Sequence, residues 1–177
     1  MLPMKHISKG GRNSAPKKSS SAHTPEAQLA SFIRRFEPGI AKLIRDCRSE
    51  MRRVLPAAFE LVYDNYNFFV IGYSSTERAS DCIVSIAAAA NGVGLSFYWG
   101  ANLPDPTNLL QGSGRQNRFI RIPNLDVLRA PDVIRLVKTA AAQGKTPLPP
   151  NRMGHLVIKS VSLRQRPRRK TDDATDL

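Results

Sequence analysis

The sequence predicts an α+β fold with a mainly antiparallel sheet and helices packed on one face. Two amphipathic helical patterns come first, a series of β-like runs follows them, and a further helical pattern comes after the runs. Grouped strands, as opposed to strict alternation with helices, are typical of this class. The 177 residues fit one domain with tails. We expect residues 24–163 to form a single domain, residues 1–23 a disordered basic arm, and residues 164–177 a disordered tail with basic and acidic residues.

The first helix is expected to begin at Pro25. Thr24 can cap it, proline suits the first turn, and the charge of Glu26 favours a helix N-terminus. Apolar residues then follow at helical spacing and form one stripe: Leu29, Phe32, Ile33 and Phe36. Pro38-Gly39 interrupts this pattern, so the helix is expected to end before it.

A second helix is predicted over residues 40–54. It ends at Leu55-Pro56, because the residue before a proline disfavours helical angles. Arg48 and Arg52 are expected on its exposed side. The residues expected to be buried against the sheet are Ile40, Leu43, Ile44, Cys47 and Met51. We interpret Cys47, and likewise Cys82, as a small core hydrophobe and not as half of a disulfide.

The runs after the second helix are rich in the branched and aromatic residues that favour strands. The predicted strands cover residues 59–63, 67–74, 82–90, 93–100 and 118–123. Asn91-Gly92 predicts a hairpin between the third and the fourth of them. Residues 75–81 are polar and typical of a turn, whereas residues 101–117 contain two prolines and two glycines and predict an irregular connection.

The last part of the predicted domain returns to helix. Residues 124–143 are expected to be helical with a break at Ala130-Pro131, and Gly144 is the expected stop. After a linker over residues 146–154, residues 155–162 predict either one more strand or an extended segment.

The net charge of +13 is unevenly placed along the chain. Residues 1–25 carry five Lys or Arg and no acid, and residues 144–177 carry eight Lys or Arg against three Asp. The middle of the chain is therefore only mildly basic. No apolar run reaches the roughly 20 residues that span a bilayer, and the N-terminal stretch lacks the apolar segment of a signal peptide. We expect a cytoplasmic protein that does not partner a membrane.

Several short blocks together carry a family resemblance. They are the helix end Leu55-Pro56, Glu60 with Tyr63, Phe97-Tyr98-Trp99-Gly100, Leu103-Pro104-Asp105-Pro106, Leu109-Leu110-Gln111-Gly112-Ser113-Gly114 and Arg118-Phe119-Ile120-Arg121. Through them, the stretch from about Pro38 to Gln143 resembles the YdhG-like domain of unknown function, family 1801. The resemblance implies a YjbR/CyaY-like fold similar to frataxin, and for part of the family an iron-chaperone role. Iron prefers acidic surfaces, whereas the first two predicted helices carry seven basic and four acidic residues, which argues against iron here.

A glycine- and arginine-rich stretch is the first candidate site. Its residues are Gly112, Ser113, Gly114, Arg115, Arg118 and Arg121. Glycines can turn backbone N–H groups toward an anion, and arginines add forked donors for a phosphate or carboxylate. The alternative is a tight turn beside solvated charges. The spacing favours this alternative, because residues three apart on a straight strand face opposite ways.

Aromatic residues of the strand region suggest a second site. Glu60, Tyr63, Tyr66, Tyr98 and Trp99 would form a pocket for a planar or apolar ligand if they lined one open sheet face. The alternative is that these side chains are ordinary half-buried sheet packing.

Catalytic and metal-binding patterns are missing from the sequence. The three histidines are scattered, no nucleophile–base spacing or CxxC pair occurs, and Glu60, Asp64 and Asp105 are isolated acids. We expect a small, soluble, non-enzymatic binding domain without a cofactor or metal site, whose ligand the sequence does not identify and for which an anion is the candidate. One alternative is an accessory protein that binds nucleic acid nonspecifically through its basic tails, since phosphate charge alone supports such binding. The weaker alternative is the iron chaperone that the resemblance implies.

Overall fold

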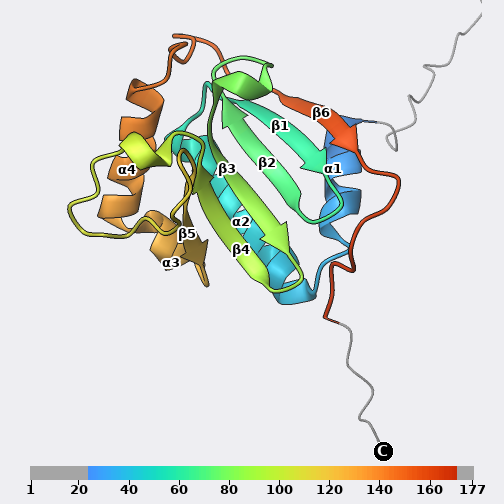
Figure 1. Ribbon diagram of the computed structural model, residues 1–177. Helices are drawn as coiled ribbons and strands as arrows, with labels where there is room; N and C mark the ends of the chain where they lie inside the picture. Colours follow the sequence, from blue (N-terminus) through green and yellow to red (C-terminus); the bar gives the residue numbers. More distant parts are fainter. Residues whose placement is uncertain (1–23, 171–177) are drawn as a thin grey trace, which may run out of the picture.

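The structure is a computed structural model, and it describes residues 24–170 (Figure 1). It is an α+β domain, as predicted, and its strands form one six-stranded sheet. In chain order the elements are α1 (Pro25–Ile33), α2 (Pro38–Val54), β1 (Phe59–Asp64), β2 (Phe69–Ser74), η2 (Ala79–Asp81), β3 (Cys82–Ala89), β4 (Gly92–Phe97), η3 (Gly100–Asn102), β5 (Arg118–Ile122), α3 (Leu125–Arg129), α4 (Pro131–Ala142) and β6 (Leu156–Val161). No helix in the described part of the chain is both long and apolar enough to cross a bilayer.

The strand order is β5-β4-β3-β2-β1-β6. All neighbours pair antiparallel except β6, which runs parallel to β1. Residues 155–162, for which the sequence allowed two interpretations, therefore contain an edge strand. The hairpin predicted at Asn91-Gly92 joins β3 to β4, where Gly92 pairs with Ala89 and has a φ of +138°, a value that favours glycine.

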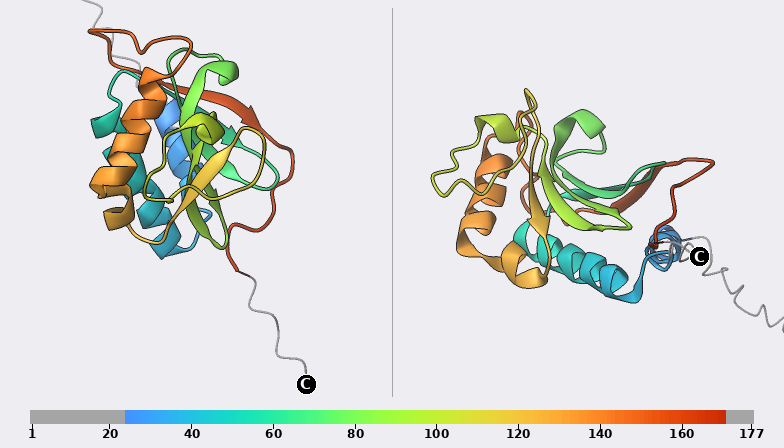
Figure 2. Two further views of the ribbon diagram at one scale, coloured as in Figure 1. Left: turned by 60° about the vertical axis from the view of Figure 1, so that its left-hand side comes forward. Right: turned by 60° about the horizontal axis from the view of Figure 1, so that its bottom comes forward.

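The core lies between the sheet and the helices. Figure 2 shows α1 and α2 along one face, while the other face carries only strand-connecting turns; we call this second face the open face. A row of branched side chains crosses the sheet on the helix side: Val62, Ile71, Ile86, Leu95 and Ile120. All five are buried, and with buried side chains of α2 they form one hydrophobic cluster. Alternation along each strand thus selects one face for the core.

Helix α2 follows the predicted register with one exception. Ile44, Cys47 and Met51 are buried and Arg52 is exposed, as expected, whereas Ile40 and Leu43 are only half-buried. The helix begins at Pro38, two residues earlier than predicted. The prediction for Arg48 was wrong, because only 14% of its side chain is exposed. This arginine reaches a buried carboxylate of β1, a long-range contact that helical periodicity does not reveal.

The C-terminal boundary of the domain also differs from the prediction. We expected residues after 163 to make almost no contact with the core, but Arg168 is only 5% exposed. Its guanidinium donates to the Asp64 carboxylate at 2.9 Å and to the carbonyl oxygens of Asn65 and Asn67 at 2.6 and 3.0 Å. Residues 164–170 are therefore part of the domain. The expectations for residues 1–23 and 171–177 fall outside the described residues.

Candidate functional site

The loop that contains Gly112–Gly114 is closed at its base. Gln111 and Phe119 exchange both backbone hydrogen bonds, at 2.8 and 3.0 Å. Gly112 has a φ of +106°, which side chains rarely tolerate. Arg118 donates to the carbonyl oxygens of Gly114 and Asn117, so part of the loop turns its acceptors toward this arginine. A nest needs converging N–H groups instead, and Arg118 here stabilises the loop.

The three arginines of this stretch do not share one face. Arg118 pairs with Phe97, which is fully buried on the helix side, whereas Arg121 pairs with Gly94 on the open face. Arg115 lies in the loop and is exposed, as is Arg121. The structure brings Arg118 to the glycines and separates Arg121 from it, as the three-residue spacing indicated. Anion binding by the loop stays a prediction.

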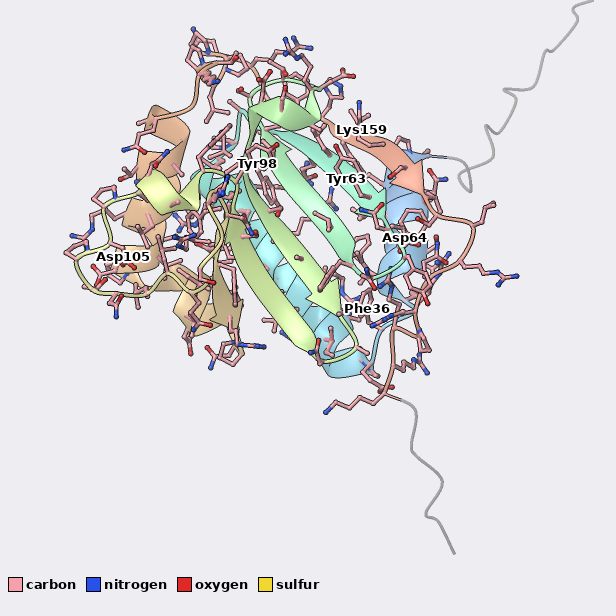
Figure 3. The ribbon with its side chains drawn as sticks, in the orientation of Figure 1. Phe36, Tyr63, Asp64, Tyr98, Asp105 and Lys159 are labelled. Atoms are coloured by element: carbon pink, nitrogen blue, oxygen red, sulfur yellow. The ribbon has the colours of Figure 1, made fainter. Side chains whose placement is uncertain are left out.

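The five residues of the predicted aromatic pocket do not meet either. Glu60 faces the helices and is only 3% exposed. Tyr66 lies in the β1–β2 turn, where the Arg166 guanidinium is 5.6 Å from the centre of its ring. Tyr98 and Trp99 follow β4 and contact each other edge to face at 5.4 Å. Tyr63 belongs to β1 and lies on the open face, whereas Tyr98 follows the end of β4, and Figure 3 shows the two tyrosines apart from each other.

Glu60 is instead held by an ionic network beneath the sheet. Arg48 donates to Glu60 at 2.6 Å through Nη2 and at 2.9 Å through Nε, and both of its terminal nitrogens also donate to Glu26. The Tyr73 hydroxyl donates to Glu60 at 3.4 Å. Burial lowers the pKa of Arg48, but the hydrogen bonds to both carboxylates leave it raised. The hydrogen bond from Arg48 lowers the pKa of Glu26.

Asp64 forms a second buried ion pair. Its carboxylate is 1% exposed and accepts from Arg168 at 2.9 Å and from Arg35 at 2.8 Å. The Arg168 side chain also lies over the Phe36 ring, at 5.7 Å from its centre. Figure 3 shows Asp64 and Phe36 on the same side of the domain. Because both oxygens of Asp64 accept from arginines, this acid has a structural role, and it does not line an open site.

A different pocket lies at one end of the sheet. It encloses only about 30 Å³ and is formed by η2, the start of β3, the segment after β4 and the segment around the end of α4. Its lining residues include Ser80, Asp81, Trp99, Leu103 and Lys145. The Lys145 ammonium lies 5.6 Å from the centre of the Trp99 ring. Of the five residues of the predicted aromatic pocket, only Trp99 lines this pocket. The other residues that line it are distant from Trp99 in sequence, so no local pattern predicted the site.

The acidic side chains of residues 24–170 are almost all engaged with bases. All except Asp105 and Asp126 lie in ion pairs, counting the contact of Glu77 with His155. Asp105 accepts from the backbone N–H groups of Leu109 and Leu110 at 3.0 and 2.7 Å. Within this range no three His, Cys, Asp or Glu side chains are arranged to hold a metal ion.

The two cysteines are not activated nucleophiles. Cys47 and Cys82 are both free thiols. Burial raises the pKa of each thiol to about 12. A reactive cysteine requires a lowered pKa, so these two residues belong to the packing.

Comparison of the chain with protein-family models, with curated proteins and with solved structures returned no match.

Proposed function

We propose that the chain is a small cytoplasmic binding domain, without catalytic chemistry of its own, that takes an anionic ligand on the open face of the sheet near β5. One observation carries the proposal. Arg115 and Arg121 are exposed, and within residues 24–170 neither has an ion-pair or hydrogen-bond partner, although nearly every carboxylate there is paired. Two unpaired guanidinium groups close in sequence favour phosphate or carboxylate ligands.

The surface beside Arg121 suits the close approach of a ligand. The register places Ala87, Gly94 and Arg121 in one row across β3, β4 and β5. Ser85 and Ser96 pair in the neighbouring row, and the Ser96 hydroxyl donates to the Asn117 side chain at 2.9 Å. The Ser96 row continues to Phe119 on β5, so the small side chains keep the open face low over β3 and β4 only. A ligand seated there would have the serine hydroxyls beneath it and Arg121 at its margin.

The family assignment is part of the same proposal. The sequence blocks between Pro38 and Gln143 support a YdhG-like domain with a frataxin-like fold. The iron-chaperone role has less support, because the acids that would attract iron are held by arginines and lysines.

Nonspecific nucleic-acid binding is the competing function, and the net charge of +13 favours it. The C-terminal basic run contributes less to it than the sequence suggested. Arg168 is buried, Arg169 lies 3.8 Å from Glu37, and Arg166 stacks on Tyr66. These three charges are therefore partly occupied within the domain.

The proposal is tested with two double variants of equal charge change. Arg115→Gln with Arg121→Gln, called the open-face variant, removes the two exposed, unpaired arginines, of which Arg121 lies on the open face and Arg115 in the adjoining loop. Arg45→Gln with Lys138→Gln is the control, because these two residues are exposed, lie on α2 and α4, and have no ion pair within the described residues. The probes are pyrophosphate, measured by calorimetry, and a fluorescent single-stranded oligonucleotide, measured by anisotropy at several salt concentrations.

We expect the open-face variant to bind pyrophosphate at least about 10-fold more weakly, the size of one charge-assisted contact. The control should stay within about 2-fold of the original affinity. Equal weakening in both variants, with a steep salt dependence for the oligonucleotide, would instead support nonspecific polyanion binding. Failure of pyrophosphate to bind the unsubstituted protein would overturn the proposal.

A further inference from the structure

Two half-exposed aromatic rings lie in the turn between β1 and β2. Tyr66 and Phe68 are each 50% exposed, although aromatic rings gain much from burial. The backbone of the turn is held from both sides. The Asn65 N–H donates to the Phe68 carbonyl at 3.0 Å, and Arg168 donates to the carbonyl oxygens of Asn65 and Asn67. The fold therefore presents these two rings at a fixed place on the surface.

The basic C-terminal segment, residues 164–170, runs beside this turn. The Arg166 N–H donates to the Tyr66 carbonyl at 2.9 Å, and the Arg166 guanidinium lies over the Tyr66 ring while it remains exposed. The segment contains five Lys or Arg and no aromatic residue. The docking of the segment thus brings its charges to aromatic rings that lie about a hundred residues earlier in the chain.

The free charge around the turn is positive. Arg168 and Arg169 are engaged within the domain, but Arg164 and Lys170 are exposed and have no ion pair within residues 24–170. The carboxylate of Asp64, at the end of β1, is buried between two arginines. A polyanion that approaches the turn therefore meets available cations and no available carboxylate.

We infer that this end of the domain binds single-stranded nucleic acid, with a base stacked on the Phe68 ring and the phosphates beside Arg164 and Arg166. No cation lies over the Phe68 ring within the described residues. Aromatic rings for the bases and cations along the backbone are the two components of sites for single strands. Because the base lies against an exposed ring, the site needs no enclosed cavity.

This binding differs from the competing function described above, which depends on phosphate charge alone. Stacking requires a base that is free to leave its neighbours, as the bases of a single strand are. The inference also uses none of the residues of the open-face site, so either site can fail without the other.

A fluorescein-labelled oligothymidylate and an abasic oligonucleotide of the same length are suitable probes. Both carry the same phosphate charge, and only the first carries bases. Anisotropy measures their binding to the full chain. We expect oligothymidylate to bind at least about 10-fold more tightly than the abasic strand, the size of one stacked base. Equal affinity for the two probes would assign the binding to phosphate charge, and either this result or no binding would overturn the inference.

Substitution of the ring then locates the site. Phe68→Leu keeps an apolar side chain and removes the stacking surface, so it should weaken oligothymidylate binding about 10-fold and leave abasic binding within about 2-fold. Tyr98→Leu is the aromatic control, since Tyr98 is exposed and lies beside the start of β3, whereas the turn lies beside its end (Figure 3). Equal weakening by the two substitutions would show that the Phe68 ring does not carry the binding.

A second pair of variants tests the charges. Arg164→Gln should weaken the binding of both probes about 3-fold or more, because both lose a phosphate contact. Arg45→Gln is the matched control, since Arg45 is exposed on α2 and has no ion pair within the described residues; it should stay within about 2-fold. If Phe68→Leu and Arg164→Gln have no effect and the open-face variant abolishes oligothymidylate binding, the strand lies on the open face and this inference is wrong.

Discussion

Substitution of Arg168 by alanine tests whether the C-terminal segment is part of the folded domain. The Arg168 side chain is 3% exposed and the Asp64 carboxylate 1%, so the change leaves a buried charge without one of its two partners. Removal of one partner from a buried ion pair costs about 3–5 kcal/mol in free energy of unfolding. Two further hydrogen bonds, to Asn65 and Asn67, are lost as well, at about 1 kcal/mol each.

Arg35 reduces this cost, because it still donates to Asp64 at 2.8 Å after the substitution. This remaining partner is 44% exposed and admits water to the site. We therefore expect Arg168→Ala to lower the free energy of unfolding by about 3 kcal/mol, near the low end of that range. In a domain of this size the midpoint of thermal unfolding should fall by about 10 °C.

Urea denaturation of the full chain, followed by circular dichroism, measures the effect. Arg169→Ala is the control, since Arg169 is 58% exposed and lies 3.8 Å from Glu37; an exposed pair of this kind contributes at most about 1 kcal/mol. Combining Arg168→Met with Asp64→Asn should recover part of the loss, because neither buried charge then remains. A loss no larger for Arg168→Ala than for Arg169→Ala would refute the docking of the segment.

Three further predictions concern titration, thiol reactivity and an unpaired hydroxyl. The hydrogen bond from Arg53 lowers the pKa of Glu50 below its ordinary 4.5. The stability that this pair contributes is therefore present above pH 4.5 and is lost as the pH falls through the lowered pKa. Glu50→Gln should make the midpoint of urea denaturation depend less on pH in the acid range, and an unchanged dependence would contradict this prediction. Cys47 and Cys82, with pKa values of about 12, should resist alkylation at pH 8 in the folded chain, and both should react in urea. Rapid alkylation of the folded protein would show that the two thiols are not packed in the interior. The Tyr63 hydroxyl is buried and has no hydrogen-bond partner within residues 24–170, so Tyr63→Phe should leave the free energy of unfolding unchanged or raise it by up to about 1 kcal/mol, whereas a loss of more than about 1 kcal/mol in urea denaturation would show that the hydroxyl is bonded.

Local patterns predicted the elements of this fold well. The branched runs predicted the strands, Thr24-Pro25 predicted the start of α1, and Ala130-Pro131 marks the junction between α3 and α4, as expected. The start of α2 was misplaced, because Pro38-Gly39 was interpreted as a break and not as the first turn of the helix. These signals lie within a few residues of the structure that they specify. The spacing of Arg118 and Arg121 likewise indicated that the two side chains lie on opposite faces of the sheet. The pairing of β5 with β4 confirms this.

The sites were predicted less well, because their partners are distant in sequence. Glu60 is oriented by Arg48 of the preceding helix, and Asp64 accepts from Arg168, more than a hundred residues later. Both acids seemed isolated in the sequence for this reason. The pocket beside Trp99 has the same origin, since α4 brings Lys145 to the end of β4 and no pattern in either segment indicates the other.

The parallel position of β6 beside β1 affects how the protein is completed during its synthesis. The strand and the docked segment that ends near Arg168 are translated after every other described element, yet they cover the edge of β1 and neutralise Asp64. Until then a nascent chain presents an open strand edge and a carboxylate whose main partner has not been made. Unpaired edges are templates for misassembly, so a ribosome that pauses within residues 140–168 would prolong the time for which the β1 edge stays uncovered.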